Sequence, residues 1–172
     1  MVKSVKLRIK SPLLTLFILA WIGGVAALLT RDQLAPPATF ASIKGEQIAL
    51  ESLRGKVVLV NFWATSCTVC LAEMPDLIET HRKYQPRGLE TIAVAVSYDP
   101  PNYVLAYSEK KALPFIVAFD PMDKLAKAFN GVSGTPTMFV IDKQGKIVQQ
   151  TTGAVDFVKL HRLIERELAA GA

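Results

Sequence analysis

Two cysteines, Cys67 and Cys70, are the only thiols in this chain of 172 residues. They follow an apolar run over residues 57–64 and lie at the start of a segment that reads as a helix. Two thiols at this spacing can close into a disulfide and reopen, and a helix N-terminus favours the attacking thiolate. We therefore predict a redox-active dithiol. A structural bridge and a metal clip are the alternatives, but a bridge over so short a loop restrains little of the unfolded chain.

Alternating strands and helices surround the cysteine pair. Continuous apolar runs over 56–63 and 89–97 are typical of strands buried on both faces, and a helix is expected over 68–84 between them. Asp99 precedes Pro100 and Pro101 and is expected to cap the next helix, which should end near Lys111. The remaining expected elements are a hairpin over 40–50, a strand over 115–119, a helix over 122–129, a hairpin over 137–150 and a last helix from Asp156. This order predicts an α/β fold with a mixed central sheet flanked by helices.

An uncharged apolar stretch over residues 13–29 follows a basic tail that contains Lys3, Lys6, Arg8 and Lys10. As a helix it would span roughly 25 Å, near the lower limit for crossing a bilayer. The positive-inside rule keeps the tail in the cytoplasm and exports the rest. We expect a cytoplasmic tail over 1–10, a transmembrane signal-anchor over 11–30, a linker over 31–37 and one domain over 38–172. A cleaved signal peptide is the alternative, and it also places the domain outside the cytoplasm.

The charge distribution gives no support to a nucleic-acid partner. The formal net charge is +5, and the four basic residues of the tail leave 5 − 4 = +1 for the rest. His81 and His161 lie far from the cysteines in sequence and are expected on the surface or in packing. No His-Cys-Met cluster suits copper or zinc, and no glycine-rich phosphate loop occurs, so we expect neither a metal nor a cofactor.

Further motifs accompany the cysteine pair. They are Val60-Asn61-Phe62-Trp63-Ala64-Thr65-Ser66-Cys67-Thr68-Val69-Cys70, Glu73-Met74-Pro75, Gly134-Thr135-Pro136-Thr137 and Ile141-Asp142-Lys143-Gln144-Gly145-Lys146-Ile147. Over residues 38–170 this set resembles the thioredoxin superfamily, and more closely the membrane-anchored TlpA/ResA-type thiol–disulfide oxidoreductases. The resemblance implies a thioredoxin-like fold with an N-terminal β-hairpin.

The resemblance also implies catalytic roles. Cys67 corresponds to the exposed attacking thiol and Cys70 to the shielded resolving thiol. Pro136 resembles a cis-proline that packs beside the disulfide and leaves a neighbouring backbone edge free for a substrate strand, although a trans-proline is far commoner in general. Pro75 resembles the kink of the active-site helix.

Substrate contact is expected from Trp63, Ser66, Thr135 and Pro136. Ser66 stands where relatives often carry a tryptophan, which changes the surface offered to a partner. Trp63 could instead belong only to the core. The residues between the cysteines, Thr68 and Val69, are neither Gly-Pro nor Glu-Pro, so the reduction potential cannot be carried over from the family.

Glu73 is a candidate proton relay. It lies three residues after Cys70, so a helix would place both side chains on one face, where a carboxylate can exchange a proton with a thiol. Cytoplasmic thioredoxins carry an acid at the position of Asn61, and an amide there cannot titrate. The alternative for Glu73 is an ordinary surface glutamate.

These observations favour a membrane-anchored, periplasmic protein disulfide reductase in a bacterial cytoplasmic membrane. Its expected partners are protein disulfide substrates, including cysteine pairs of apocytochrome c or of copper sites, and a transmembrane electron-donor protein. A disulfide oxidase or isomerase would use the same residues in other directions. A non-enzymatic copper-handling or chaperone module is the alternative from another class, since two thiolates could hold Cu(I) transiently.

Overall fold

The computed structural model describes residues 34–130 and 132–171. The predicted cytoplasmic tail and signal-anchor lie outside these residues. Within them, no helix has the length and apolar character needed to span a bilayer.

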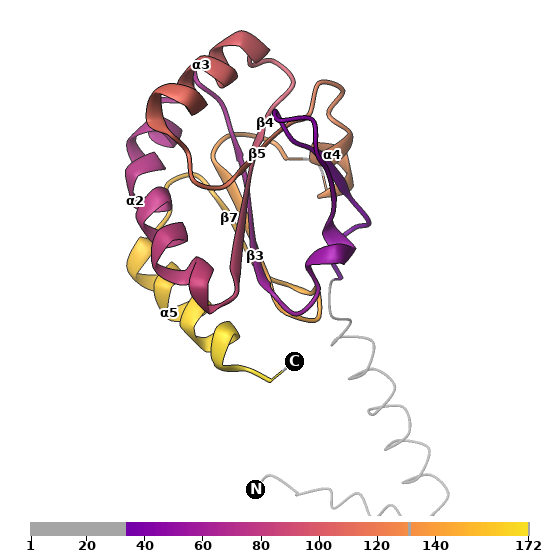
Figure 1. The fold of residues 1–172 in the computed structure, drawn as a ribbon, viewed down its shortest axis with the longest axis vertical. Helices are drawn as coiled ribbons and strands as arrows, with labels where there is room; N and C mark the ends of the chain where they lie inside the picture. The colour runs from indigo at the N-terminus through magenta and orange to yellow at the C-terminus, as the bar shows by residue number, and fades with distance from the viewer. Residues whose placement is uncertain (1–33, 131, 172) are drawn as a thin grey trace, which may run out of the picture. The chain divides into compact units, whose positions relative to one another are not determined.

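A five-stranded mixed sheet forms the centre of the fold (Figure 1). The strands lie in the order β5-β4-β3-β6-β7. The strands β3 (Val57–Trp63), β4 (Leu89–Ala95) and β5 (Ile116–Phe119) run parallel, β6 (Thr137–Ile141) runs antiparallel to β3, and β7 (Ile147–Thr152) antiparallel to β6. All residues of β3 are buried, as expected for a central strand covered on both faces. The predicted mixed sheet is therefore confirmed.

Helices and the segment directly before β3 cover the two faces of this sheet (Figure 1). The helices α2 (Thr68–Tyr84), α3 (Pro101–Lys111) and α5 (Phe157–Ala169) pack on the face that includes Leu59 and Trp63 of β3. The other face, with Val60 and Phe62, packs against α4 (Lys124–Ala128) and the segment that carries β1 (Thr39–Ala41), β2 (Gln47–Ala49) and the short helix η1 (Leu50–Leu53). Alternate residues of β3 thus serve two separate apolar cores.

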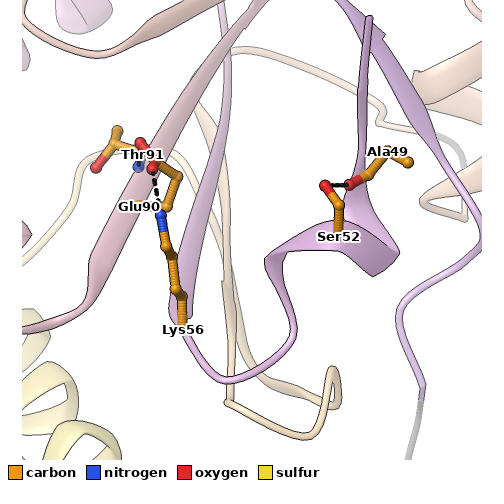
Figure 2. A network of polar contacts seen from close by, with 5 residues as sticks. All are labelled: Ala49, Ser52, Lys56, Glu90 and Thr91. Carbon is orange, nitrogen blue, oxygen red and sulfur yellow. Dashed lines mark hydrogen bonds and ion pairs between the residues drawn. The ribbon is translucent and has the colours of Figure 1, made fainter.

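The segment before β3 is tied to the sheet by several polar contacts. β1 and β2 pair antiparallel, and the Ile43 N–H donates to Val117 O of β5 at 2.9 Å. Within the segment, the hydroxyl of Ser52 in η1 donates to the carbonyl of Ala49 at the end of β2 (Figure 2), and the distance is 2.7 Å. In the same view, Lys56 Nζ donates to Glu90 Oε2 at 3.2 Å and links the segment entering β3 to the start of β4.

Two helix starts differ from the sequence prediction. α4 begins at Lys124 rather than at residue 122, because Asp123 has a φ of +54° and cannot continue a right-handed helix. α3 begins at Pro101, one residue later than the predicted cap at Asp99 implies, because Asp99 does not cap it. The N-cap position is taken by Pro100, which has no capping side-chain bond, and the Asp99 carboxylate turns toward a different partner.

Candidate active site

Cys67 and Cys70 form a disulfide across the first turn of α2. Cys67 is the N-cap residue, and its Sγ accepts a hydrogen bond from the Cys70 N–H at 3.2 Å. Cys67 is partly exposed, whereas Cys70 is only 3 % exposed. After reduction, the positive end of the helix would favour a thiolate at Cys67, where an external disulfide can reach it.

The sheet brings Thr135 and Pro136 to the end of β3 from which the chain continues to the disulfide. Thr137 lies opposite Phe62 in the antiparallel β3–β6 pair. Following this pairing outward places Pro136 and then Thr135 beside the turn that leads from β3 to Cys67. The Thr135–Pro136 peptide bond is cis, as the resemblance implied, and Pro136 is buried.

The main chain of Thr135 is open to a partner. Its N–H and C=O have no hydrogen-bond partner among residues 34–130 and 132–171. Its hydroxyl lies 3.1 Å from the phenolic oxygen of Tyr98. Ser66 is exposed on the loop that leads into Cys67. Unpaired main-chain groups at such an edge can pair with an incoming extended segment.

Trp63 lies in the core rather than on the surface of the site. Its side chain is 0 % exposed and packs against Tyr107, with 5.4 Å between the ring centroids. The expected contact of Trp63 with substrate is not supported by this burial. Asn61, at the position where cytoplasmic relatives carry an acid, is also buried, and its Oδ1 has no partner within the described residues.

Glu73 is partly buried, and its carboxylate is hydrogen-bonded to another part of the chain. Its Oε1 accepts a 2.6 Å hydrogen bond from the Val155 N–H, in the loop between β7 and α5. Burial raises the pKa of the Glu73 carboxyl above its ordinary value; the Val155 bond opposes this shift, and the negative charge of Asp76 adds to it. The helix runs from Thr68 through Pro75 to Tyr84, so Cys70 and Glu73 lie three residues apart on one continuous helix.

A buried carboxylate fixes the loop that precedes Cys67. Asp99 is 1 % exposed and accepts two hydrogen bonds from Thr65, one from the N–H at 2.6 Å and one from the hydroxyl at 2.5 Å. Thr65 lies between the end of β3 and Cys67, where its N–H no longer pairs with a neighbouring strand. The Asp99 carboxylate accepts from this N–H and from the Thr65 hydroxyl instead. The sequence prediction missed this contact because an acid before two prolines fits a local cap equally well.

The two histidines are packing residues, in keeping with the sequence prediction. His81 is buried against Phe115, and burial lowers its pKa. The ring of His161 lies 2.8 Å from the Thr80 hydroxyl and packs on Tyr84. No group of three or more His, Cys, Asp or Glu residues suited to a metal occurs in the described part of the chain.

The chain is similar to known thiol–disulfide exchange proteins. The chain matches the Redoxin family over residues 30–162. It is 36% identical over 131 residues to the thiol-disulfide oxidoreductase ResA of Geobacillus kaustophilus, across 76% of this chain and 74% of that protein. It is 38% identical over 119 residues to the ResA of Bacillus anthracis, across 69% and 68% of the two chains. A thioredoxin-family thiol:disulfide interchange protein from Chlorobium tepidum has a similar crystal structure, with a TM-score of 0.74, 28% identity, and coverage of 81% of this chain and 99% of that one.

Proposed function

The chain belongs to the Redoxin family and is a TlpA/ResA-like thiol–disulfide oxidoreductase of the thioredoxin superfamily, and on that premise we propose that it reduces disulfides in extracytoplasmic proteins. The observation that carries the disulfide-exchange chemistry is the unequal exposure of Cys67 and Cys70 beside the open main chain of Thr135, and the reducing direction is proposed from the family resemblance. An exposed sulfur can meet a substrate disulfide, while the shielded sulfur stays available for the second step.

The reaction transfers two electrons in two exchanges. The Cys67 thiolate attacks one substrate sulfur, a mixed disulfide forms, and the second substrate sulfur leaves as a thiolate. The Cys70 thiolate then attacks Cys67 Sγ and releases the first substrate sulfur. The substrate gains two electrons and two protons, and the protein is left with the Cys67–Cys70 disulfide. Its return to the dithiol requires a two-electron donor, which we assign to the dithiol of a transmembrane protein.

The direction of electron flow can be tested by the reduction potential of the Cys67–Cys70 pair. We expect a value closer to the roughly −270 mV of thioredoxin than to the roughly −120 mV of a strong oxidant such as DsbA. The protein is equilibrated in defined thiol–disulfide buffers and the free thiols are counted by alkylation, with the Cys67→Ser/Cys70→Ser double variant as background. A potential near that of the oxidant would support the alternative of disulfide formation. Tight Cu(I) binding without disulfide exchange would support the copper-handling alternative.

Within this proposal the domain works on the periplasmic side of the cytoplasmic membrane. Residues 1–10 remain in the cytoplasm, 11–30 form a single-pass anchor, 31–37 a linker, and 38–172 the exported catalytic domain. The support is the basic tail directly before the apolar stretch. Cysteine pairs of apocytochrome c or of copper sites are the substrates that the family resemblance suggests.

This placement predicts that a reporter active only outside the cytoplasm works when fused after Ala172. The matched control carries the same fusion with residues 1–33 deleted and should be inactive. An inactive full-length fusion at normal expression would contradict export. A mature chain that begins near Leu28 would contradict only the anchor.

We assign Glu73 the role of exchanging a proton with Cys70, and Ser66, Thr135 and Pro136 that of contacting substrate. A carboxyl with a raised pKa carries a proton at neutral pH more often than an ordinary glutamate, which suits this exchange. Oε1 is held by Val155, whereas Oε2 has no partner among the described residues and is free to bind the proton.

Glu73→Gln is expected to slow disulfide exchange near neutral pH by roughly 10-fold and to shift its pH profile. The amide oxygen can still accept the Val155 N–H, so the loop should remain in place. Because the folded-state pKa is raised, the stabilising contribution of Glu73 is complete below its ordinary value of 4.5 and is lost as the pH rises through the folded pKa. The variant should lose this pH dependence without becoming less stable at pH 7.

Exchange rates from roughly pH 5 to 9 and thermal unfolding at the same pH values measure both effects. Glu79→Gln, which changes an exposed glutamate of the same helix, is the matched control. Wild-type rates for Glu73→Gln across the range would leave Glu73 with a structural role only.

A further inference from the structure

We propose that a cavity lined by Thr135 binds an apolar or aromatic side chain that neighbours the target cysteine of the substrate, and that Tyr98 sets this preference. The inference rests on the proposed function, because it names the substrate class for the same site. The cavity has a volume of about 320 Å³. Its walls come from the loop after β4 (residues 96–98), from α4, and from the loop before Pro136 (residues 132–135).

Two features relate this cavity to the loops around the disulfide. Tyr98 directly precedes Asp99, whose carboxylate holds Thr65 two residues before Cys67. The Tyr98 hydroxyl also lies 3.1 Å from the hydroxyl of Thr135, the residue with the unpaired main chain. The cavity is therefore continuous with the edge at which a substrate strand would pair.

The lining favours an apolar occupant. Val96, Ala126 and Val132 supply aliphatic surface, and Tyr98 adds a large ring that is 64% exposed. Covering this ring with a substrate side chain removes apolar surface from water on both partners, and aromatic pairs gain further from their ring geometry. Asp123 and Lys127 also line the cavity and supply one charged group of each sign.

The size and position of the cavity point to a side chain of a polypeptide. At about 320 Å³ it lies at the lower end of the range for whole small-molecule ligands. An extended segment paired with Thr135 would project successive side chains to opposite sides, so one of them can enter the cavity while its cysteine meets Cys67. The contact between the Tyr98 and Thr135 hydroxyl groups places the ring next to the residue where the substrate would pair.

The test uses disulfide-bonded peptides that differ at one residue. Phe or Ser is placed immediately before, or immediately after, the target cysteine, and kcat and KM are measured for reduction of each peptide. The wild type is expected to prefer Phe at one of these positions by about 10-fold in kcat/KM, mainly through KM. Tyr98→Ala should reduce the preference to about 2-fold, and Tyr98→Phe, which keeps the ring, should retain most of it. Ser133→Phe, which fills the cavity from an exposed position, should also abolish it.

Tyr103→Ala is the matched control, because Tyr103 is 60% exposed on α3 but does not line the cavity. Tyr103→Ala should reduce every peptide at the wild-type rate and keep the wild-type preference. Equal kcat/KM for the two residues in the wild type, or an unchanged preference in Tyr98→Ala, would overturn the inference and leave the proposed function standing. Failure of the wild type to reduce any disulfide would instead refute the proposed function.

Discussion

Cys70→Ser is expected to accumulate mixed disulfides with substrate proteins through Cys67, whereas Cys67→Ser is expected to form none and to lose exchange to the background level. The reason lies in the geometry of the first turn of α2. Cys67 caps the helix at a partly exposed position, and Cys70 is almost fully covered. Only Cys67 can therefore attack a protein disulfide, and only Cys70 is placed to release the product.

Non-reducing gels of the two variants after incubation with an oxidised protein substrate measure this difference. In the reduced wild type, alkylation should be faster at Cys67, with a pKa below the roughly 8.5 of a free thiol, and slow at Cys70. The double serine variant controls for adducts that do not involve the pair. Mixed disulfides on Cys67→Ser and none on Cys70→Ser would reverse the assignment.

Local sequence patterns were sufficient to predict the elements that carry the cysteines. The continuous apolar run gave the strand that the structure has as β3, Val57–Trp63, and the predicted helix has the bounds of α2, Thr68–Tyr84. These elements are specified by their own residues, since a strand covered on both faces needs an unbroken apolar run. The motifs around Cys67 and Pro136 added the expectation of a cis-proline, which the structure bears out.

These local patterns could not predict contacts between loops that are distant in the sequence. Glu73 bonds to Val155, 82 residues further along the chain, and Tyr98 bonds to Thr135, 37 residues further along. No periodicity or spacing encodes such pairs, because the sheet topology alone decides which loops meet. Trp63 illustrates the same limit, since an aromatic residue before the motif suits the core and the substrate surface equally well until its burial is known.

The contact between Asp99 and Thr65 has the largest expected effect among the residues that sequence reasoning missed. It joins loops 34 residues apart, and both hydrogen bonds end on one buried carboxylate. Hydrogen bonds to a charged group contribute about 1.5–3 kcal/mol each before the cost of burying that group. Asp99→Ala should therefore lower the free energy of unfolding by about 2 kcal/mol. Thr65→Val removes only the hydroxyl bond and should cost about 1.5 kcal/mol.

Asp99→Ala should also slow the attack of Cys67, because Thr65 would no longer hold the chain between β3 and the N-cap of α2. We expect a decrease of roughly 10-fold in exchange rate, since small displacements of a reacting group are costly.

Asp99→Asn can keep a hydrogen bond to the N–H and to the hydroxyl of Thr65 if the hydroxyl turns to accept, so it should restore most of the rate. Chemical denaturation of both single variants and of the Asp99→Ala/Thr65→Val double variant gives the coupling energy. If the losses in unfolding free energy of the two single variants add up to that of the double variant, Asp99 and Thr65 act independently. If Asp99→Ala also keeps the wild-type exchange rate, the Asp99–Thr65 contact is not needed to position Cys67.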